Sequence, residues 1–423
     1  MVMKAGYKQT EVGVIPEDWE VKALGEISHP VRGGSPRPAG DPKYFNGNYI
    51  PWLTVAALTN LSEAQLYVSQ TEGYLTEEGS KWSRIIEKDT LIIANSGATL
   101  GVAKLLEIKC CANDGIAALY NLSQEVSKLY LVYYINSKTK YLRDVVATGN
   151  GQPNLNTSLI SDFKVPLPPT IAEQTAIATA LSDTDELIQS LEKLITKKRL
   201  IKHGALQELL KPKENWVEKS LDELFAFSGG LTASREQLSD KGLAYLHYGD
   251  IHGSKKSYID IEREYADIPK LDVPLNKVPS ATLLGDGDLV FVDASEDDEG
   301  TSRHVVIKNP NAMPYIAGLH TIVAKSTNDL VDKNYRQYCF QSNDVKRQFK
   351  FYAVGTKVSG VSKSNIGKIL LTLPPTNDEQ RRIAASLSDM DAELAALEAK
   401  LDKYRHIKQG MMQELLTGRI RLV

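Results

Sequence analysis

The sequence predicts an α+β protein: two mixed α/β domains of similar fold, separated by a long antiparallel two-helix coiled coil, with an internal pseudo-twofold repeat. Three observations lead to this prediction. The stretch LPPTIAEQ at 167–174 returns as LPPTNDEQ at 373–380. Each copy is followed by apolar residues alternately four and three positions apart, which is the spacing of a coiled-coil seam. The sequence before each copy contains short apolar runs broken by Gly, Asn and Asp, as in β-strands and their turns.

The repeat runs without a gap at an offset of 206 residues. Further upstream the halves diverge, yet DWEVKALGEI at 18–27 has a fainter echo in NWVEKSLDEL at 215–224. Self-similarity of this kind indicates one structural unit built twice, so we divide the chain into four parts. These parts are a first domain at 1–165, a first helical region at 166–212, a second domain at 213–372 and a second helical region at 373–423.

Each helical region predicts one long helix that starts just after its Pro-Pro pair, since proline is tolerated in a first helical turn. An apolar stripe often only packs a helix on its own domain, but two matched stripes favour an intramolecular pair. Polar residues at 184, 198, 202 and 408 interrupt the stripes and could help to fix the register. The predicted interface residues are Glu173, Gln174, Ile177, Leu181, Ile188, Leu191 and Ile195 in the first helix, and Glu379, Gln380, Ile383, Leu387, Leu394, Leu397 and Leu401 in the second.

The two domains are predicted to be rich in β-structure, with a few shorter helices. The expected strands are TLIIA at 90–94, DLVFV at 288–292, HVVIK at 304–308 and HTIVAK at 320–325. Helical segments are expected near 129–147 and 334–352, and both carry aromatic and basic residues together.

Composition sets limits on the function. The chain has 423 residues, 42% of them hydrophobic, which is enough for two to four globular domains. A net charge of -3 and a pI near 6.2 give no whole-chain signal for nucleic acid, so any basic surface must be local. Cys110, Cys111 and Cys339 lack paired spacing and read as reduced structural cysteines, which favours a cytoplasmic protein. No signal peptide or membrane-spanning run is recognised.

Motifs for most enzyme classes are missing from the sequence. The nearest approach to a phosphate-binding loop, GTKVSGVS at 355–362, has Val361 where the motif needs lysine. The acidic run at 293–299 does not have the spacing of an EF-hand, so we interpret it as a solvated loop. The sequence therefore predicts no catalytic residue, no metal site and no cofactor in this chain.

Three polar, glycine-bearing segments recur in the same order in both halves, at 31–38, 94–101 and 148–158, and at 228–236, 297–304 and 355–365. Such residues are common in any turn. They also suit DNA, because Arg pairs with guanine, Asn and Gln pair with adenine, and hydroxyl groups hold phosphates. The candidate DNA contacts are Arg32, Ser35, Arg37, Asn95, Ser96, Asn150, Gln152, Asn154 and Asn156 in the first half, and Thr232, Ser234, Arg235, Thr301, Ser302, Arg303, His304, Lys357, Ser359, Ser362 and Lys363 in the second.

The full chain resembles the specificity subunit of type I restriction-modification systems. The resemblance lies in KQTEVGVIPEDWEVKALGEI near the N-terminus, in the segment from VPLPPTIAEQ to ALQELL, and in the tail from LPPTNDEQ to LLTGRIRL. It implies two target-recognition domains that each read one half of a bipartite DNA target, and a coiled coil that fixes the gap between the halves. It also implies two modification subunits that use S-adenosylmethionine to methylate adenine, and restriction subunits that use ATP and Mg²⁺. The chain itself would be non-catalytic. The acidic run at 293–299 departs from expectation, because it would repel phosphates unless one of its carboxylates accepts a hydrogen bond from cytosine N4.

Two other interpretations remain open. A scaffold whose coiled coil only joins protein partners would not bind DNA, whereas a DNA reader should lose affinity steeply as salt rises. An unrecognised nuclease or transferase would show activity from the purified chain alone.

Overall fold

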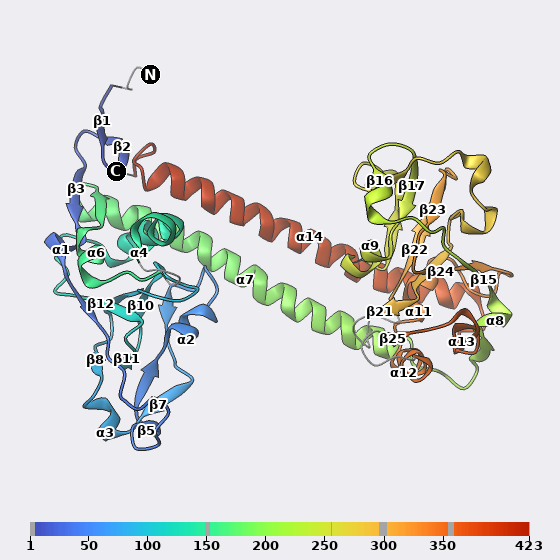
Figure 1. Ribbon diagram of the computed structural model, residues 1–423, viewed down its shortest axis with the longest axis horizontal. Helices are drawn as coiled ribbons and strands as arrows, with labels where there is room; N and C mark the ends of the chain where they lie inside the picture. The colour runs from blue at the N-terminus through green and yellow to red at the C-terminus, as the bar shows by residue number, and fades with distance from the viewer. Residues whose placement is uncertain (1–4, 149–152, 255, 296–302, 354–358, 423) are drawn as a thin grey trace. The chain divides into compact units, whose positions relative to one another are not determined.

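The computed structural model describes residues 5–148, 153–254, 256–295, 303–353 and 359–422 (Figure 1). The chain divides into two compact units. Unit 1 comprises Met1–Leu194 with Leu397–Val423, and unit 2 comprises Ile195–Ala396. Each unit therefore holds one α/β domain together with a stretch of both long helices, α7 (Ile171–Leu209) and α14 (Asn377–Leu415). Among the described residues, no helix is long and apolar enough to cross a membrane.

Unit 1 is organised around a five-stranded sheet. Its strands, in order, are β4 (His29–Arg32), β12 (Ile116–Tyr120), β9 (Leu91–Ala94), β10 (Ala103–Leu106) and β6 (Tyr67–Val68). A second sheet contains β7 (Gly73–Leu75), β5 (Phe45–Leu53), β11 (Cys110–Ala112) and β8 (Arg84–Ile86). Two short pairs complete the strands: β1 (Tyr7–Thr10) with β2 (Gly13–Pro16), and β3 (Glu20–Ala23) with β13 (Lys164–Leu167).

The five-stranded sheet of unit 1 is buried on both faces. Leu91 and Ile93 of β9 pack into one core with helix α4 (Lys128–Ser137) and with residues of α7 and α14. The alternate residues Ile92 and Ala94 pack on the other side, against the second sheet. Successive side chains of a strand point to opposite faces, so a strand buried on both faces is apolar throughout. This is why TLIIA reads as a continuous apolar run.

The remaining helices of unit 1 are short. They are α1 (Leu24–Ile27), α2 (Val55–Thr59), α3 (Glu77–Ser80), α5 (Thr139–Tyr141), the π-helical turn η1 (Leu142–Val146) and α6 (Thr157–Asp162). The predicted helical segment near 129–147 thus consists of α4, α5 and η1 in succession. Its first part is helical and buried because the six residues from Tyr130 to Ile135 pack on the sheet.

Unit 2 repeats the five-stranded sheet strand by strand. The order is β15 (Phe225–Gly229), β24 (Thr321–Ser326), β20 (Leu289–Val292), β22 (His304–Lys308) and β18 (Tyr258–Asp260). The strand directions also match: the first four are antiparallel to their neighbours, and the last pair is parallel in both units. The second sheet contains β16 (Leu238–Ser239), β19 (Lys270–Leu271), β17 (Leu243–Leu246) and β23 (Tyr315–Ala317). The predicted strands and the internal repeat are confirmed.

The other elements of unit 2 match those of unit 1 only in part. Its remaining strands are β14 (Val217–Ser220) paired with β26 (Leu370–Leu373), and β21 (Ala294–Ser295) paired with β25 (Ser359–Gly360). Its helices are α8 (Leu221–Leu224), η2 (Arg235–Gln237), α9 (Tyr248–Gly253), α10 (Ile261–Glu264), η3 (Leu275–Lys277), η4 (Ser280–Thr282), α11 (Arg336–Cys339), α12 (Asn343–Tyr352) and α13 (Lys363–Gly367). Trp19 and Trp216, from the faint sequence echo, are each buried in the core of their own unit.

Candidate nucleic-acid interface and helix pairing

A glycine pair fixes the first polar loop in both units. An added Cβ at Gly33 would lie 2.2 Å from the carbonyl oxygen of Asn113, and one at Gly230 would lie 1.8 Å from that of Gly318. Any side chain at these positions would collide with backbone, so the close approach requires glycine. Both contacts are made to the turn that links β11 to β12 in unit 1 and β23 to β24 in unit 2. The two loops therefore leave their sheets from the same point of one shared framework.

In unit 1 the candidate residues of the first loop gather around Asp114. Ser35 Oγ donates a hydrogen bond of 2.7 Å to Asp114 Oδ1, and Arg37 lies 3.7 Å from Asp114 Oδ2. Arg32 donates from Nε to the Asp114 backbone carbonyl. The guanidinium of Arg37 is largely exposed. Asp114 thus holds the loop while leaving a cationic group free to meet a ligand.

The second and third loops of unit 1 meet at Asn95. This side chain is only 1% exposed, its Nδ2 donates to the Asp114 carbonyl at 3.3 Å, and its own backbone carbonyl accepts from Leu155. Ser96 forms a β-bridge with the half-buried Asn154. Asn95 therefore joins the second and third loops from a buried position. Its loop sequence, by contrast, predicts a position facing solvent. The candidates Asn150 and Gln152 lie outside the described residues.

Asn156 and Ser362 occupy matching positions in the repeat, and each caps the N-terminus of a short helix. Asn156 Oδ1 accepts the backbone N–H of Leu159 at 2.8 Å and caps α6, while Ser362 Oγ accepts from Asn365 at 3.2 Å and caps α13. An N-cap side chain satisfies a donor that the helix leaves unpaired. Both remain exposed, so capping does not remove them from the surface.

In unit 2 the first loop exposes Thr232, Ser234 and Arg235. Arg235 pairs with Asp250 of α9 at 3.2 Å, so an aspartate orients a loop arginine here as Asp114 does in unit 1. The following elements add an aromatic cluster. Tyr248 lies with its ring centroid 5.4 Å from that of His320, and His320 Nδ1 lies 3.2 Å from Asp293 Oδ1. Asp293, the first residue of the acidic run, is thus paired with the imidazole of His320.

The other candidates of unit 2 divide between surface and core. Arg303 is exposed and donates to the His252 carbonyl. His304 is buried, with its ring near those of Phe291 and Phe340, so it belongs to the core and not to the surface on which we predicted it. Lys363 reaches the first loop, because its Nζ would lie 3.3 Å from a Cβ at Gly229. Ser359 opens β25; Thr301, Ser302 and Lys357 lie outside the described residues.

The predicted site residues do not include one exposed aromatic residue that lies beside the first loop of unit 1. Trp82 is 61% exposed and, with Lys81 and Arg84, lines a shallow hollow of about 620 Å³ beside Gly33 and Gly34. Arg84 Nε donates 2.9 Å to the backbone carbonyl of Arg32. Aromatic and basic residues in this arrangement can stack on bases and hold phosphates. The run KWSR at 81–84, where basic residues flank an aromatic one, was the available signal.

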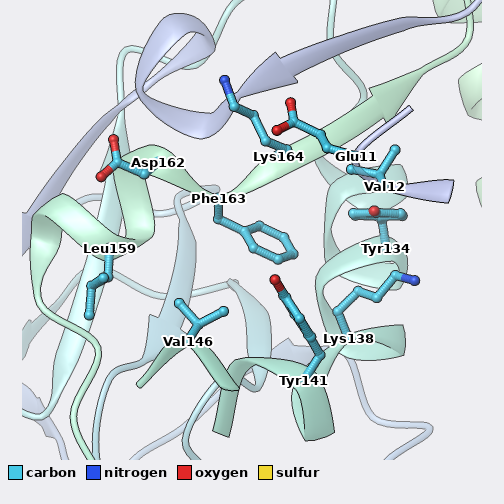
Figure 2. A pocket seen from close by; sticks show the side chains of 10 residues that line it. All are labelled: Glu11, Val12, Tyr134, Lys138, Tyr141, Val146, Leu159, Asp162, Phe163 and Lys164. Atoms are coloured by element: carbon cyan, nitrogen blue, oxygen red, sulfur yellow. The ribbon is translucent and has the colours of Figure 1, made fainter. Parts of the chain in front are cut away.

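A second cavity of unit 1 is not part of the repeated framework (Figure 2). It has a volume of about 480 Å³ and lies between the β1–β2 turn, α4, α6 and β13. Tyr134, Tyr141 and Phe163 line it, and Lys138 and Asp162 stand at its edge. The repeat places Lys, Ile and Leu at 368–370 where unit 1 has Asp, Phe and Lys at 162–164. The lining is therefore a property of unit 1 alone at these positions.

Within each unit, the stretches of α7 and α14 pair in antiparallel directions. In unit 1, Thr184 Oγ1 lies 3.5 Å from Met411 Sδ and Glu192 lies 2.7 Å from Arg405, so partner numbers fall on α14 as they rise on α7. In unit 2, Lys198 lies 2.6 Å from Glu393. Most of the predicted seam is buried, namely Ile177, Leu181, Ile188, Leu191, Ile195, Ile383, Leu387, Leu394 and Leu401, whereas Leu397 is half-buried.

Residues of the seam also pack into the domain cores. This agrees with the simpler interpretation, in which an apolar stripe packs a helix on its own domain. Ile177 and Leu181 pack into the main core of unit 1 together with Leu415 of α14. Ile383 and Leu387 pack into that of unit 2 together with Leu206 of α7. The ends of each helix therefore belong to a domain, and both interpretations of the stripe hold.

The Glu-Gln pair at the start of each long helix is held inside its own unit. Gln174 and Gln380 are buried, and each makes three hydrogen bonds to backbone groups. The partners are Glu125, Ser127 and Pro168 for Gln174, and Leu330, Asp332 and Pro374 for Gln380. Glu173 is bound by Arg421 near the C-terminus, and Glu379 by Lys213 at 2.7 Å. Lys213 lowers the pKa of Glu379.

Comparison with known proteins places these features in a family. The family model described as "Type I restriction modification DNA specificity domain" matches residues 16–199 and again 213–403. The chain is 26% identical to the type I restriction enzyme MjaIX specificity subunit of Methanocaldococcus jannaschii, over 98% of this chain and 96% of that protein. It is 28% identical to the HindI specificity subunit of Haemophilus influenzae, over 36% of this chain and 33% of the other.

Solved structures share the fold. The S subunit of a type I restriction-modification system from M. genitalium superposes with a TM-score of 0.57 at 15% identity, covering 98% of this chain and 99% of the other. A chain from a solved structure described as showing complex assembly and conformational transition of the type I R-M system superposes with a TM-score of 0.57 at 14% identity, covering 96% of this chain and 99% of the other.

Proposed function

The chain belongs to the type I restriction-modification DNA specificity family, and from this premise we propose that each of its two units reads one half of a bipartite DNA target. The observation that carries the proposal is the pairing of one framework with two different surfaces. The five-stranded sheets agree in strand order and direction, and the glycine contacts to the turn agree as well. The side chains at the loops differ between the units. Such a protein is suited to reading two different short sequences with one architecture.

The loop side chains have the chemistry for this role. Arg37 in unit 1 and Arg235 in unit 2 are exposed arginines, each oriented by an aspartate. Arginine forms two parallel hydrogen bonds to O6 and N7 of guanine in the major groove. Trp82 in unit 1, beside Gly33 and Gly34 of the first loop, and Tyr248 in unit 2, beside His320, add aromatic surface. We assign direct base contacts to the arginines and positioning on the sugar-phosphate backbone to the hydroxyl groups and lysines.

We further propose that the helix pair sets the spacing between the two half-sites. Helices α7 and α14 each contain 39 residues, which corresponds to about 58 Å at about 1.5 Å per residue. Two half-sites in successive major grooves lie about 34 Å apart, so helices of this length can serve as a spacer. In this role the register of the pair sets the gap between the half-sites.

Modification subunits are the proposed partners of the helices. Ile201 and Ile407 occupy matching positions in the repeat and are 46% and 40% exposed, each in its own unit. Exposed apolar residues at matched positions suit two copies of one partner. These partners would bring S-adenosylmethionine for adenine methylation, and restriction subunits would add ATP- and Mg²⁺-dependent cleavage. The present chain supplies recognition.

Domain exchange tests the proposal. The chain is assembled with its modification subunits, residues 20–160 are replaced by the matching residues of a relative, and methylated adenines are mapped in the DNA. One half of the target should change while the other half stays as it was. Unchanged recognition of both halves would contradict the proposal. The salt dependence of binding provides a second measurement, because a reader that contacts several phosphates loses affinity steeply as salt rises.

A further inference from the structure

A buried ion pair lies in the helix seam of unit 1, where the apolar stripe is interrupted. Lys408 Nζ of α14 lies 2.6 Å from Asp185 Oδ1 of α7, and the two side chains are only 15% and 3% exposed. Tyr133 of α4 donates its hydroxyl to Asp185 Oδ2 at 2.8 Å. Burial raises the pKa of Asp185, which Lys408 opposes. This network joins the α/β domain, its own helix and the opposite helix.

Unit 2 contains a corresponding network with the helices exchanged, but it is less buried, because Asp391 is 32% exposed. Tyr338 of α11 donates to Asp391 Oδ2 of α14 at 2.9 Å, and Lys202 of α7 binds Asp391 Oδ1. Asp391 and Lys408 match Asp185 and Lys202 at the offset of the repeat. Each long helix therefore contributes an aspartate to one network and a lysine to the other.

The apolar seam cannot by itself choose how far the helices slide. A heptad pattern repeats every seven residues, so a register shifted by one heptad places apolar residues opposite each other again. In that shifted register Lys408 would face Glu192, and the same slide would bring Lys202 opposite Glu398. These two lysines would still meet carboxylates, but the slide would break the present Glu192–Arg405 and Lys198–Glu393 pairs and bring Arg405 opposite Arg199. The charges therefore favour the present register, as does the packing of Leu415 and Leu206 in the domain cores, and Asp185 is the most deeply buried of the charged groups.

We propose that the tyrosine-bound aspartates, chiefly the buried Asp185, select the register in which α7 and α14 pair. Tyr133 holds Asp185 under the domain whatever α14 does, because both belong to the first domain and its own helix. In the shifted register this buried carboxylate would lose its lysine, and a buried charge without a partner is strongly unfavourable. The gain at Glu192 would not compensate, because its side chain is 31% exposed and exposed ion pairs contribute little.

For DNA recognition, the consequence follows from the proposed function. A slide of one heptad moves one helix about 10.5 Å along the other. At about 3.4 Å per base pair, this is a change of about three base pairs in the gap between half-sites. The networks would therefore act as positioning residues for target spacing.

Disulfide trapping in the full chain reports the register without any DNA. Thr184→Cys with Met411→Cys joins residues in contact in the present register, and Leu191→Cys with Met411→Cys joins those that would meet after the slide. With both aspartates intact, only the first pair should crosslink. Adding Asp185→Asn and Asp391→Asn removes the charge at constant shape and should produce the second crosslink. Adding Glu192→Gln and Glu398→Gln as well removes the competing partners, so neither lysine favours the shifted register and both crosslinks should form.

The parent chain without engineered cysteines is the background control, since burial raises the pKa of Cys110 and Cys339 and leaves little reactive thiolate. Crosslinking of the Asn variant through the first pair alone would overturn the proposal and leave the networks a purely structural role. If the Asn variant does not fold, a second variant tests register selection by the same crosslinks. It carries Tyr133→Phe, Tyr338→Phe, Asp185→Leu, Asp391→Leu, Lys202→Leu and Lys408→Leu. It leaves no buried charge, and a folded chain that forms only the first crosslink would equally overturn the proposal.

Methylation mapping with the modification subunits then links register to target. The Asn variant should modify half-sites of unchanged sequence at a gap altered by about three base pairs. A shifted crosslink with an unchanged gap would support the register inference and count against the proposed role of the helices as a spacer. The two failures are therefore distinguishable.

Discussion

Gln174 and Gln380, 206 residues apart in the sequence, bind equivalent backbone groups in their two units. Each donates from Nε2 to the carbonyl of the first proline in the repeated Leu-Pro-Pro-Thr sequence and to a carbonyl in the turn before the next domain helix. Each also accepts a backbone N–H from that turn through Oε1. The glutamine thus fixes the start of the long helix on its domain. This contact explains why the Leu-Pro-Pro-Thr sequence and the glutamine occur together in both halves.

Replacement of either glutamine by leucine should destabilise its own unit. Gln174→Leu would leave a backbone N–H and two carbonyls without their partner, and a buried group left unsatisfied costs about 1–3 kcal/mol. Denaturant unfolding would show a loss of at least that size. Gln413→Leu is the matched control, because Gln413 is exposed on α14 and should change stability little.

Alanine at Gly230 should disturb one half of the target and leave the other intact. Its Cβ would lie 1.8 Å from the Gly318 carbonyl, so the first loop of unit 2 must move. Methylation mapping with the partner subunits should show relaxed or lost recognition of one half-site. Gly410→Ala is the control: nothing lies within 4 Å of the added carbon, and alanine inside a helix should stabilise by about 0.5–1 kcal/mol. Unchanged recognition in Gly230→Ala would show that this loop does not face the DNA.

The pattern of apolar residues along the chain predicts strands and helices, but it does not predict which polar side chains of a loop are buried. The strand TLIIA follows from a continuous apolar run and the two long helices follow from regular spacing of apolar residues, so the sequence predicts them. The exposure of a polar loop residue has no such pattern. Asn95 and Trp82 show this, because the amide is buried while the indole is exposed to solvent. The reason is tertiary: Asn95 meets the Asp114 carbonyl only after the sheet has formed.

Proline at Leu194 should break α7 and prevent assembly with the modification subunits. Proline inside a helix removes a hydrogen bond and clashes with the preceding turn, at a cost of about 3 kcal/mol or more. Leu194 is partly exposed, so the loss of its side chain contributes little of this. Leu194→Ala is therefore the control and should assemble normally. Co-purification measures the result, and a Leu194→Pro chain that assembles with normal yield would contradict a role for the intact helix.

The C-terminal clamp of unit 1 should make stability depend on pH. Arg421 donates two hydrogen bonds of 2.9 Å to Asp18 and also binds Glu173, and this holds the pKa of Asp18 below its ordinary value of 3.8. Because the folded-state pKa is lowered, the stabilisation is present above about pH 4 and is lost as pH falls through the lowered value. Arg421→Ala should therefore destabilise the chain near neutral pH, and the difference from the natural chain should shrink in acid.

Urea unfolding at about pH 7 and about pH 3 measures this difference. Arg421→Lys keeps the charge but not the two-pronged geometry, so it should recover only part of the stability. A difference that stays constant with pH would assign the effect of Arg421 to packing over Trp19, whose ring centroid lies 5.9 Å from its guanidinium carbon.

Arg37 and Arg235 should each govern recognition of one half-site. Both are exposed at the first loop of their unit and held by an aspartate, so removal of the guanidinium should cost about 1–3 kcal/mol in binding to the natural target. The loss should be largest for duplexes whose corresponding half is intact and should vanish for duplexes already altered there, because a base contact cannot be lost twice. Arg381→Ala is the control, since Arg381 pairs with Asp332 and Asp378 at the start of α14. A uniform loss across all duplexes, together with a shallower salt dependence, would instead place these arginines on phosphates.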